Sequence, residues 1–114
     1  MEKFVYPAVL AYNEKNRYFT IHVPDLEIIS SGRTVEEAYL EAEDFIASYL
    51  EFSKKMDALD NGVSTFEKVR KKNPKNTILL TSVSLPKNME LTDKEKAFKE
   101  EIARLAHEGE KSDE

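Results

Sequence analysis

The chain has 114 residues, with 17 Lys and Arg against 22 Asp and Glu and a formal net charge of −5. This length supports one compact domain and a short appendage. Because the sequence contains no cysteine, disulfides, cysteine–zinc sites, iron–sulfur clusters and thiol catalysis are excluded. No apolar run approaches the roughly 18 residues that a membrane span needs, and the first residues, MEKFVYP, lack a signal-peptide core. We therefore expect a cytoplasmic protein without membrane contact.

The first part of the chain is predicted to form a β-hairpin. Residues 4–12 alternate in character, and residues 17–23 are rich in the aromatic and β-branched types that strands prefer. The polar connection at 13–16 contains two asparagines, which favour turns. Pro24-Asp25 ends the second strand, and residues 26–30 can return as a short third strand.

The clearest local signal is an amphipathic helix over residues 35–55. Thr34 and Glu37 form a capping box, in which the Thr34 hydroxyl accepts from the Glu37 amide and the Glu37 carboxylate reaches back to the Thr34 amide. Apolar residues follow at helical spacing, and the acids fall mostly between them and face water.

The second half of the chain is predicted to hold a strand and a helix after a long connection. Asp60-Asn61-Gly62 is a turn sequence within a polar, lysine-rich connection at 60–76. Residues 77–85 predict a fourth strand that Pro86 closes. A second capping box, Thr92-Asp93-Lys94-Glu95, begins a C-terminal helix that Gly109 is predicted to end, before a frayed tail.

These elements predict an α+β fold of the order β-β-β-α-β, with the helix at 35–55 on one face of the sheet and a C-terminal helix added. We expect residues 1–88 to form the main domain and residues 89–114 to form the C-terminal helix and an acidic tail. The strand at 77–85 should lie parallel to another strand through a right-handed crossover. Because one sheet face would stay partly exposed, we also expect a homodimer or a higher homo-oligomer.

Three short motifs carry a family resemblance. They are Tyr6-Pro7-Ala8-Val9-Leu10, Val23-Pro24-Asp25-Leu26 and the run from Gly32 to Ala38. In this order they resemble HicB-type antitoxins over residues 5–50, and weakly at 77–85. The resemblance implies a partial ribonuclease H-like fold and an antitoxin of a type II toxin–antitoxin system. Such an antitoxin binds and occludes a small basic HicA-type toxin, an mRNA-cleaving endoribonuclease.

The sequence departs from this family after the second strand. Glu27-Ile28-Ile29-Ser30 stands where the family usually has Pro-Gly and a small residue, so we expect the usual sharp turn to be absent. Residues 86–114 provide one acidic helix, which is too little for the DNA-binding unit that family members often add. Its negative charge also argues against direct DNA binding.

Because the order of strands and helices is that of a ribonuclease H-like fold, a nuclease is one hypothesis for the function. Such a nuclease needs several carboxylates on its strands to hold Mg²⁺. The predicted strands at 4–12, 17–23 and 77–85 contain no Asp or Glu, and Asp25 lies just past the second strand. The only histidines, His22 and His107, have no partners at the spacing of a triad or a metal pair. We therefore expect no catalytic residue, no metal, no cofactor and no enzyme activity.

The predicted function is protein binding through an acidic surface. Residues 25–51 carry eight acids and one base, a charge pattern that would steer a basic partner. We expect partner contacts from two exposed tyrosines and from the acidic stretches, namely Tyr12, Tyr18, Asp25, Leu26, Glu27, Glu36 and Glu37. The alternatives are a DNA-binding autoregulator of its own operon, which could use only the basic stretch at 68–75, and a degenerate ribonuclease H-like scaffold without a toxin.

Overall fold

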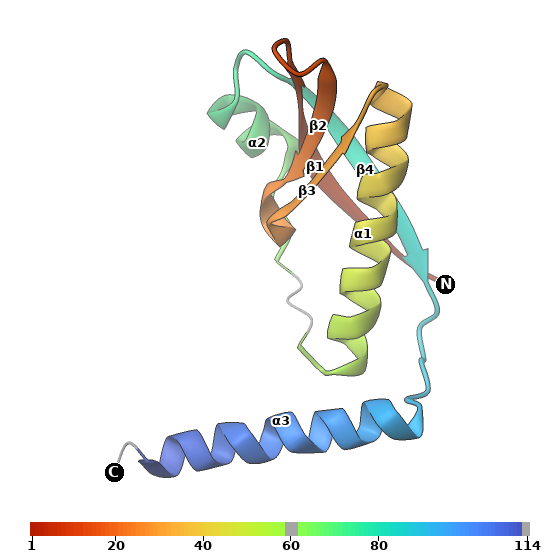
Figure 1. The fold of residues 1–114 in the computed structure, drawn as a ribbon, viewed down its shortest axis with the longest axis vertical. Helices are drawn as coiled ribbons and strands as arrows, with labels where there is room; N and C mark the ends of the chain where they lie inside the picture. The colour runs from red at the N-terminus through yellow and green to blue at the C-terminus, as the bar shows by residue number, and fades with distance from the viewer. Residues whose placement is uncertain (59–61, 113–114) are drawn as a thin grey trace.

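A four-stranded antiparallel sheet in the order β3-β2-β1-β4 forms the centre of the molecule. The computed structural model describes residues 1–58 and 62–112 (Figure 1). The elements in chain order are β1 (Glu2–Asn13), β2 (Tyr18–Val23), the 3-10 turn η1 (Pro24–Leu26), β3 (Ile28–Gly32), α1 (Val35–Lys55), α2 (Phe66–Lys72), β4 (Thr77–Leu85) and α3 (Asp93–Ser112). The α+β class is confirmed, as are the predicted bounds of α1 and β4.

The direction of β4 differs from the prediction. It pairs antiparallel with β1 in an uninterrupted register from Glu2↔Leu85 to Leu10↔Thr77, so the expected parallel crossover was wrong. Helix α1 starts at the hairpin end of the sheet and runs to the opposite end (Figure 1). The segment with α2 then brings the chain back to the hairpin end, where β4 begins beside Leu10. This return path makes β4 antiparallel to β1.

Helix α2 lies inside the stretch predicted as a connection. Its first turn is capped by Thr65, whose hydroxyl accepts from the Lys68 amide at 3.2 Å, and Val69 is buried. The sequence pattern did not indicate this helix, because seven residues with one buried apolar side chain show no helical period. Two residues of the predicted turn, Asp60 and Asn61, lie outside the described residues.

The core lies between α1 and one face of the sheet. The helix buries a stripe at i, i+4 spacing, and the strands contribute alternate residues of β1, β2 and β4. The buried residues of this cluster are Tyr6, Ala8, Ile21, Val23, Ala38, Ala42, Ile46, Leu50, Val83 and Leu85. On the opposite face, α2 contacts β1 and β4. The single main helix on one face is therefore as predicted.

Local contacts fix the start of α1 against the end of β3. The Thr34 hydroxyl accepts from the Glu37 amide at 3.1 Å, as the capping box predicts. The Glu37 carboxylate accepts from the amide of Arg33 at 2.9 Å, one residue earlier than expected. Gly32 permits this close approach, because a Cβ there would lie 2.5 Å from the Ala38 amide nitrogen and 2.7 Å from the Glu37 Cβ.

Replacing Gly32 with alanine is expected to lower the free energy of unfolding by about 1–3 kcal/mol, because the added methyl group would push α1 away from β3. Urea denaturation followed by circular dichroism measures this change. Ser31→Ala is the matched control, since Ser31 is exposed and its backbone amide is retained; it should stay within about 0.5 kcal/mol of the parent protein. Equal stabilities of the two variants would contradict the close packing at Gly32.

Helix α3 begins at the predicted capping box but does not stop where expected. The Thr92 hydroxyl accepts from the Glu95 amide at 3.2 Å, and the Glu95 carboxylate accepts from the Thr92 amide at 3.0 Å. The helix continues to Ser112, so the prediction that Gly109 ends it was wrong. An internal glycine costs a helix only about 1 kcal/mol relative to alanine, which is too little to end it by itself. None of the helices in the described residues is long and apolar enough to cross a membrane.

Candidate interaction surface

The predicted contact residues divide between two ends of the sheet. Strand β2 has six residues, so Tyr18 and the η1 turn are separated by roughly 20 Å at about 3.3 Å per residue. Gly32 pairs with Phe19, which places the start of α1 at the hairpin end. Tyr12, Tyr18, Glu36 and Glu37 therefore lie near the hairpin end, whereas Asp25, Leu26 and Glu27 lie at the other end.

At the η1 end, Asp25 is engaged inside the fold. Its carboxylate oxygens accept from the Ser64 amide at 2.8 Å and the Ser64 hydroxyl at 2.6 Å, and these bonds hold the segment that leads into α2. Leu26 packs against the core, and only Glu27 projects into solvent, 3.9 Å from the Nε2 atom of His22. Of the three predicted contact residues here, Glu27 is the one whose charge faces outward.

The η1 turn also corrects an expectation about the backbone. Glu27 adopts the left-handed conformation with φ of 54°, and its amide donates to the Pro24 carbonyl at 3.4 Å. A sharp turn is therefore present, although the sequence lacks the Pro-Gly that is usual at this position in the family it resembles. A non-glycine residue in this region is strained, and the pairing of β2 with β3 on either side holds it there.

At the hairpin end, the two tyrosines lie on opposite faces of the sheet. Tyr12 pairs with Phe19 across the strands, and their rings are in tilted contact with centroids 4.7 Å apart, whereas Tyr18 pairs with Asn13. Tyr12 is about half exposed and Tyr18 is partly buried. Because side chains alternate along a strand, one flat partner surface cannot cover both rings from the same side.

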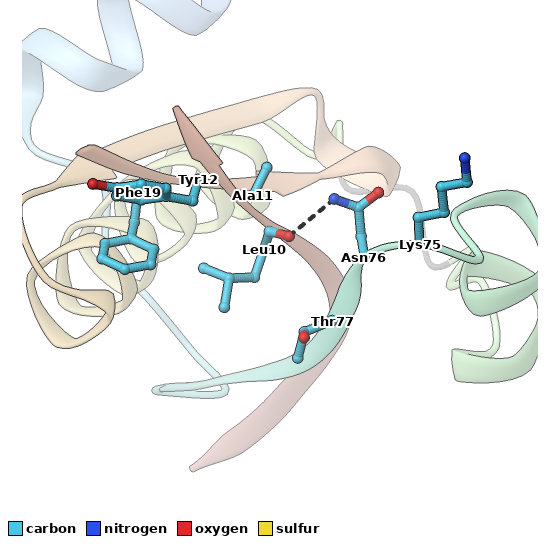
Figure 2. A pocket seen from close by; sticks show the side chains of 7 residues that line it. All are labelled: Leu10, Ala11, Tyr12, Phe19, Lys75, Asn76 and Thr77. Carbon is cyan, nitrogen blue, oxygen red and sulfur yellow. Dashed lines mark hydrogen bonds between the residues drawn. The ribbon is translucent and has the colours of Figure 1, made fainter. Parts of the chain in front are cut away.

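A shallow pocket of about 230 Å³ lies beside Tyr12 and Phe19 (Figure 2). Lys75 and Asn76 form its other side, and the Asn76 side-chain amide donates to the Leu10 carbonyl at 3.2 Å. The sequence did not indicate this pocket, because its two sides come from segments more than sixty residues apart that only the β1–β4 pairing joins. Lys75 also makes this edge of the hairpin end basic rather than acidic.

The outer side of α1 combines negative charge with an exposed apolar residue. Leu40 is 55% exposed, and the residues three and four positions before and after it, which surround it on a helix, are all acidic. We call this set the Leu40 surface; it consists of Glu36, Glu37, Leu40, Glu43 and Asp44. Burial and the neighbouring carboxylate of Glu43 raise the pKa of Tyr39, whose hydroxyl donates to the Leu80 carbonyl at 3.1 Å.

Sequence reasoning identified Glu36 and Glu37 but missed Leu40. Its position falls outside the i, i+4 stripe of buried residues, and that mismatch with the helical period was the available signal. From Val35 to Tyr49 the chain has five acids and no lysine or arginine. The Leu40 surface therefore offers an apolar anchor inside a continuous acidic face.

The carboxylates do not assemble into a metal centre in the part of the chain that the structure describes, where no group of three or more His, Asp or Glu side chains could hold an ion. Strand β1 starts earlier than predicted and includes one acid, Glu2, whose carboxylate pairs with the Lys54 ammonium at 2.6 Å. This carboxylate thus stabilises the end of α1 against the sheet.

No protein-family model and no curated protein sequence matches the chain. The architecture, a β3-β2-β1-β4 sheet with one long helix on a face, is nevertheless a HicB-like fold. The N-terminal domain of the Burkholderia pseudomallei antitoxin HicB matches with a TM-score of 0.64 and 20% identity, over 72% of this chain and 100% of that chain.

Two further structures support the same fold. The crystal structure of the Burkholderia pseudomallei antitoxin HicB matches with a TM-score of 0.62 and 17% identity, over 93% of this chain and 85% of that chain. A chain of a toxin–antitoxin complex from Streptococcus pneumoniae matches with a TM-score of 0.61 and 13% identity, over 99% of this chain and 100% of its own length. The fold implied by the three sequence motifs is therefore confirmed.

Proposed function

We propose that this protein is an antitoxin that binds a small basic toxin of the HicA type. The observation that carries the proposal is the HicB-like fold, which it shares with an antitoxin and with a chain of a toxin–antitoxin complex over nearly its whole length. In this proposal the protein acts in the cytoplasm by occlusion and performs no reaction of its own. Residues 1–88 would form the unit that binds.

The Leu40 surface is the docking site that the contacts and charges favour. Leu40 would enter an apolar depression of the toxin, as the central anchors of protein interfaces do, while the surrounding acids face the cations that otherwise bind RNA phosphates. Two of the predicted contact residues, Glu36 and Glu37, belong to this surface, and the nearby hairpin end could add Tyr12. Glu27, at the far end of the sheet, would act only through its long-range field.

The proposal is tested by titrating the full chain against a purified HicA-type toxin in a calorimeter. We expect a stable complex with the parent protein and a loss of about tenfold in affinity for Leu40→Ala, since each factor of ten corresponds to about 1.4 kcal/mol. The matched control is Leu80→Ala, because Leu80 on β4 is 52% exposed, close to the value for Leu40. Absence of complex formation would refute the antitoxin role, and equal losses for both variants would refute only this docking surface.

The DNA-binding alternative stays a prediction. Its basic stretch is partly the helix α2, where Arg70 pairs with Glu67 at 2.6 Å and Lys71 and Lys72 are exposed. A gel shift with the DNA upstream of the coding region distinguishes this alternative from toxin binding.

A further inference from the structure

Helix α3 carries an apolar stripe that the rest of the described chain leaves largely uncovered. Phe98, Ile102 and Leu105 follow one another at i, i+4 and i+7, and they are 48%, 44% and 53% exposed. Figure 1 shows α3 apart from the sheet: it passes below the C-terminal end of α1, and its own C-terminal half extends beyond that end. Three large apolar side chains at about half exposure on one helix face indicate an interaction surface.

The contacts that fix α3 are concentrated in its first two turns. Glu95 pairs with Lys55 at 2.9 Å, Lys99 pairs with Asp57, and the Phe98 ring lies 6.0 Å from the Phe52 ring. Hydrogen bonds from the Thr92 amide and from Lys55 lower the pKa of Glu95, so this carboxylate stays charged when it holds the start of α3. The stripe beyond Phe98 extends past these contacts, although in proteins most of the stability of a helix comes from the packing of its apolar face.

We propose that α3 pairs antiparallel with α3 of a second copy of this chain. The charge along the helix favours this occupant and this direction. Residues 93–99 carry three lysines and two acids, whereas residues 100–108 carry three glutamates and one arginine. An antiparallel arrangement places the positive half of each helix beside the negative half of the other, whereas a parallel arrangement would align like charges.

The stripe has the symmetry that such a pair requires. Ile102 lies near the middle, so a two-fold axis beside it brings Phe98 of each helix toward Leu105 of the other. The sheets and their α1 helices then extend from opposite ends of the pair. This leaves the Leu40 surface of each copy away from the α3 contact, and the inference goes beyond the proposed function because it holds whether or not a toxin binds.

Sedimentation velocity at micromolar concentration tests the pairing. We expect the parent protein to be a dimer and Ile102→Lys to be a monomer, because a lysine in the centre of the stripe would have to be buried. His107→Lys is the matched control, since it adds a charge in the same part of the helix but on the opposite side, and it should stay dimeric. A monomeric parent protein, or a dimer that survives Ile102→Lys, would overturn the proposal.

Cysteine substitution tests the direction, because the chain has no cysteine of its own. In an antiparallel pair, Ile102→Cys should form a disulfide-linked dimer, and Phe98→Cys should form one with Leu105→Cys in a mixture rather than with itself. Efficient self-linkage of Phe98→Cys would indicate a parallel pair and contradict the proposal. If Ile102→Lys abolished toxin binding while the protein stayed dimeric, the stripe would belong to the toxin and not to a second copy.

Discussion

Reversing the charges of Glu36 and Asp44 to lysine is expected to slow association with the basic toxin by about tenfold at low salt. Both side chains are exposed on the Leu40 surface, where they would attract the cationic partner before contact. Since such steering is screened by ions, the association rate of the parent protein should fall as salt is added, and that of the double variant should change little. Stopped-flow or biosensor kinetics at low and high salt measure both effects.

The matched control for this reversal is the double variant Glu27→Lys with Glu90→Lys. It changes the net charge by the same amount, and both side chains are exposed away from the Leu40 surface. Asp25 is unsuitable for such a test, because its carboxylate anchors Ser64 and its loss would disturb the path into α2. An equal slowing in the control would mean that total charge, or the η1 end, directs the encounter.

Replacing Ile46 with alanine is expected to lower the free energy of unfolding by about 3 kcal/mol. Ile46 is fully buried between α1 and the sheet, so the variant loses apolar contacts and leaves a cavity. This is a large share of the roughly 5–15 kcal/mol that stabilises a typical domain. Urea denaturation at neutral pH measures it, provided that the slope of the transition stays unchanged.

Leu40→Ala is the natural comparison for Ile46→Ala, because Leu40 lies on the same helix but is more than half exposed. Leu40→Ala should lower the free energy of unfolding by less than about 1 kcal/mol, while it weakens toxin binding. Ile46→Ala should show the reverse, with lower stability and unchanged affinity of the folded protein. If the two variants lost stability equally, the packing of α1 described above would be wrong.

Several elements were predictable because their signals are local. The capping boxes at Thr34 and Thr92 depend on residues three positions apart, and the stripe of α1 repeats over many turns. The predicted bounds at 35–55 and 77–85 therefore agree with α1 and β4. Helix α2 escaped detection because one buried residue, Val69, sets no period.

The candidate site was only partly predictable. The acidic stretches predicted exposed charges at Glu36 and Glu37, and both residues are exposed. The same stretches include Asp25, whose carboxylate instead accepts hydrogen bonds from Ser64, and composition alone could not show this difference. Nor could it show that Tyr12 and Tyr18 face opposite sides of the sheet, since that depends on the register of β1 with β2. Exposure and orientation are properties of the assembled sheet.

The amino-acid sequence by itself determined the class of fold, the long helix and the acidic character of its outer side, because periodicity, capping and charge act between residues near one another in the chain. Only the tertiary structure decided that β4 runs antiparallel to β1, that Asp25 is bound to Ser64, and that most of the stripe of α3 is left uncovered. These features depend on the path by which distant segments return to the sheet, and local physical preferences do not specify that path.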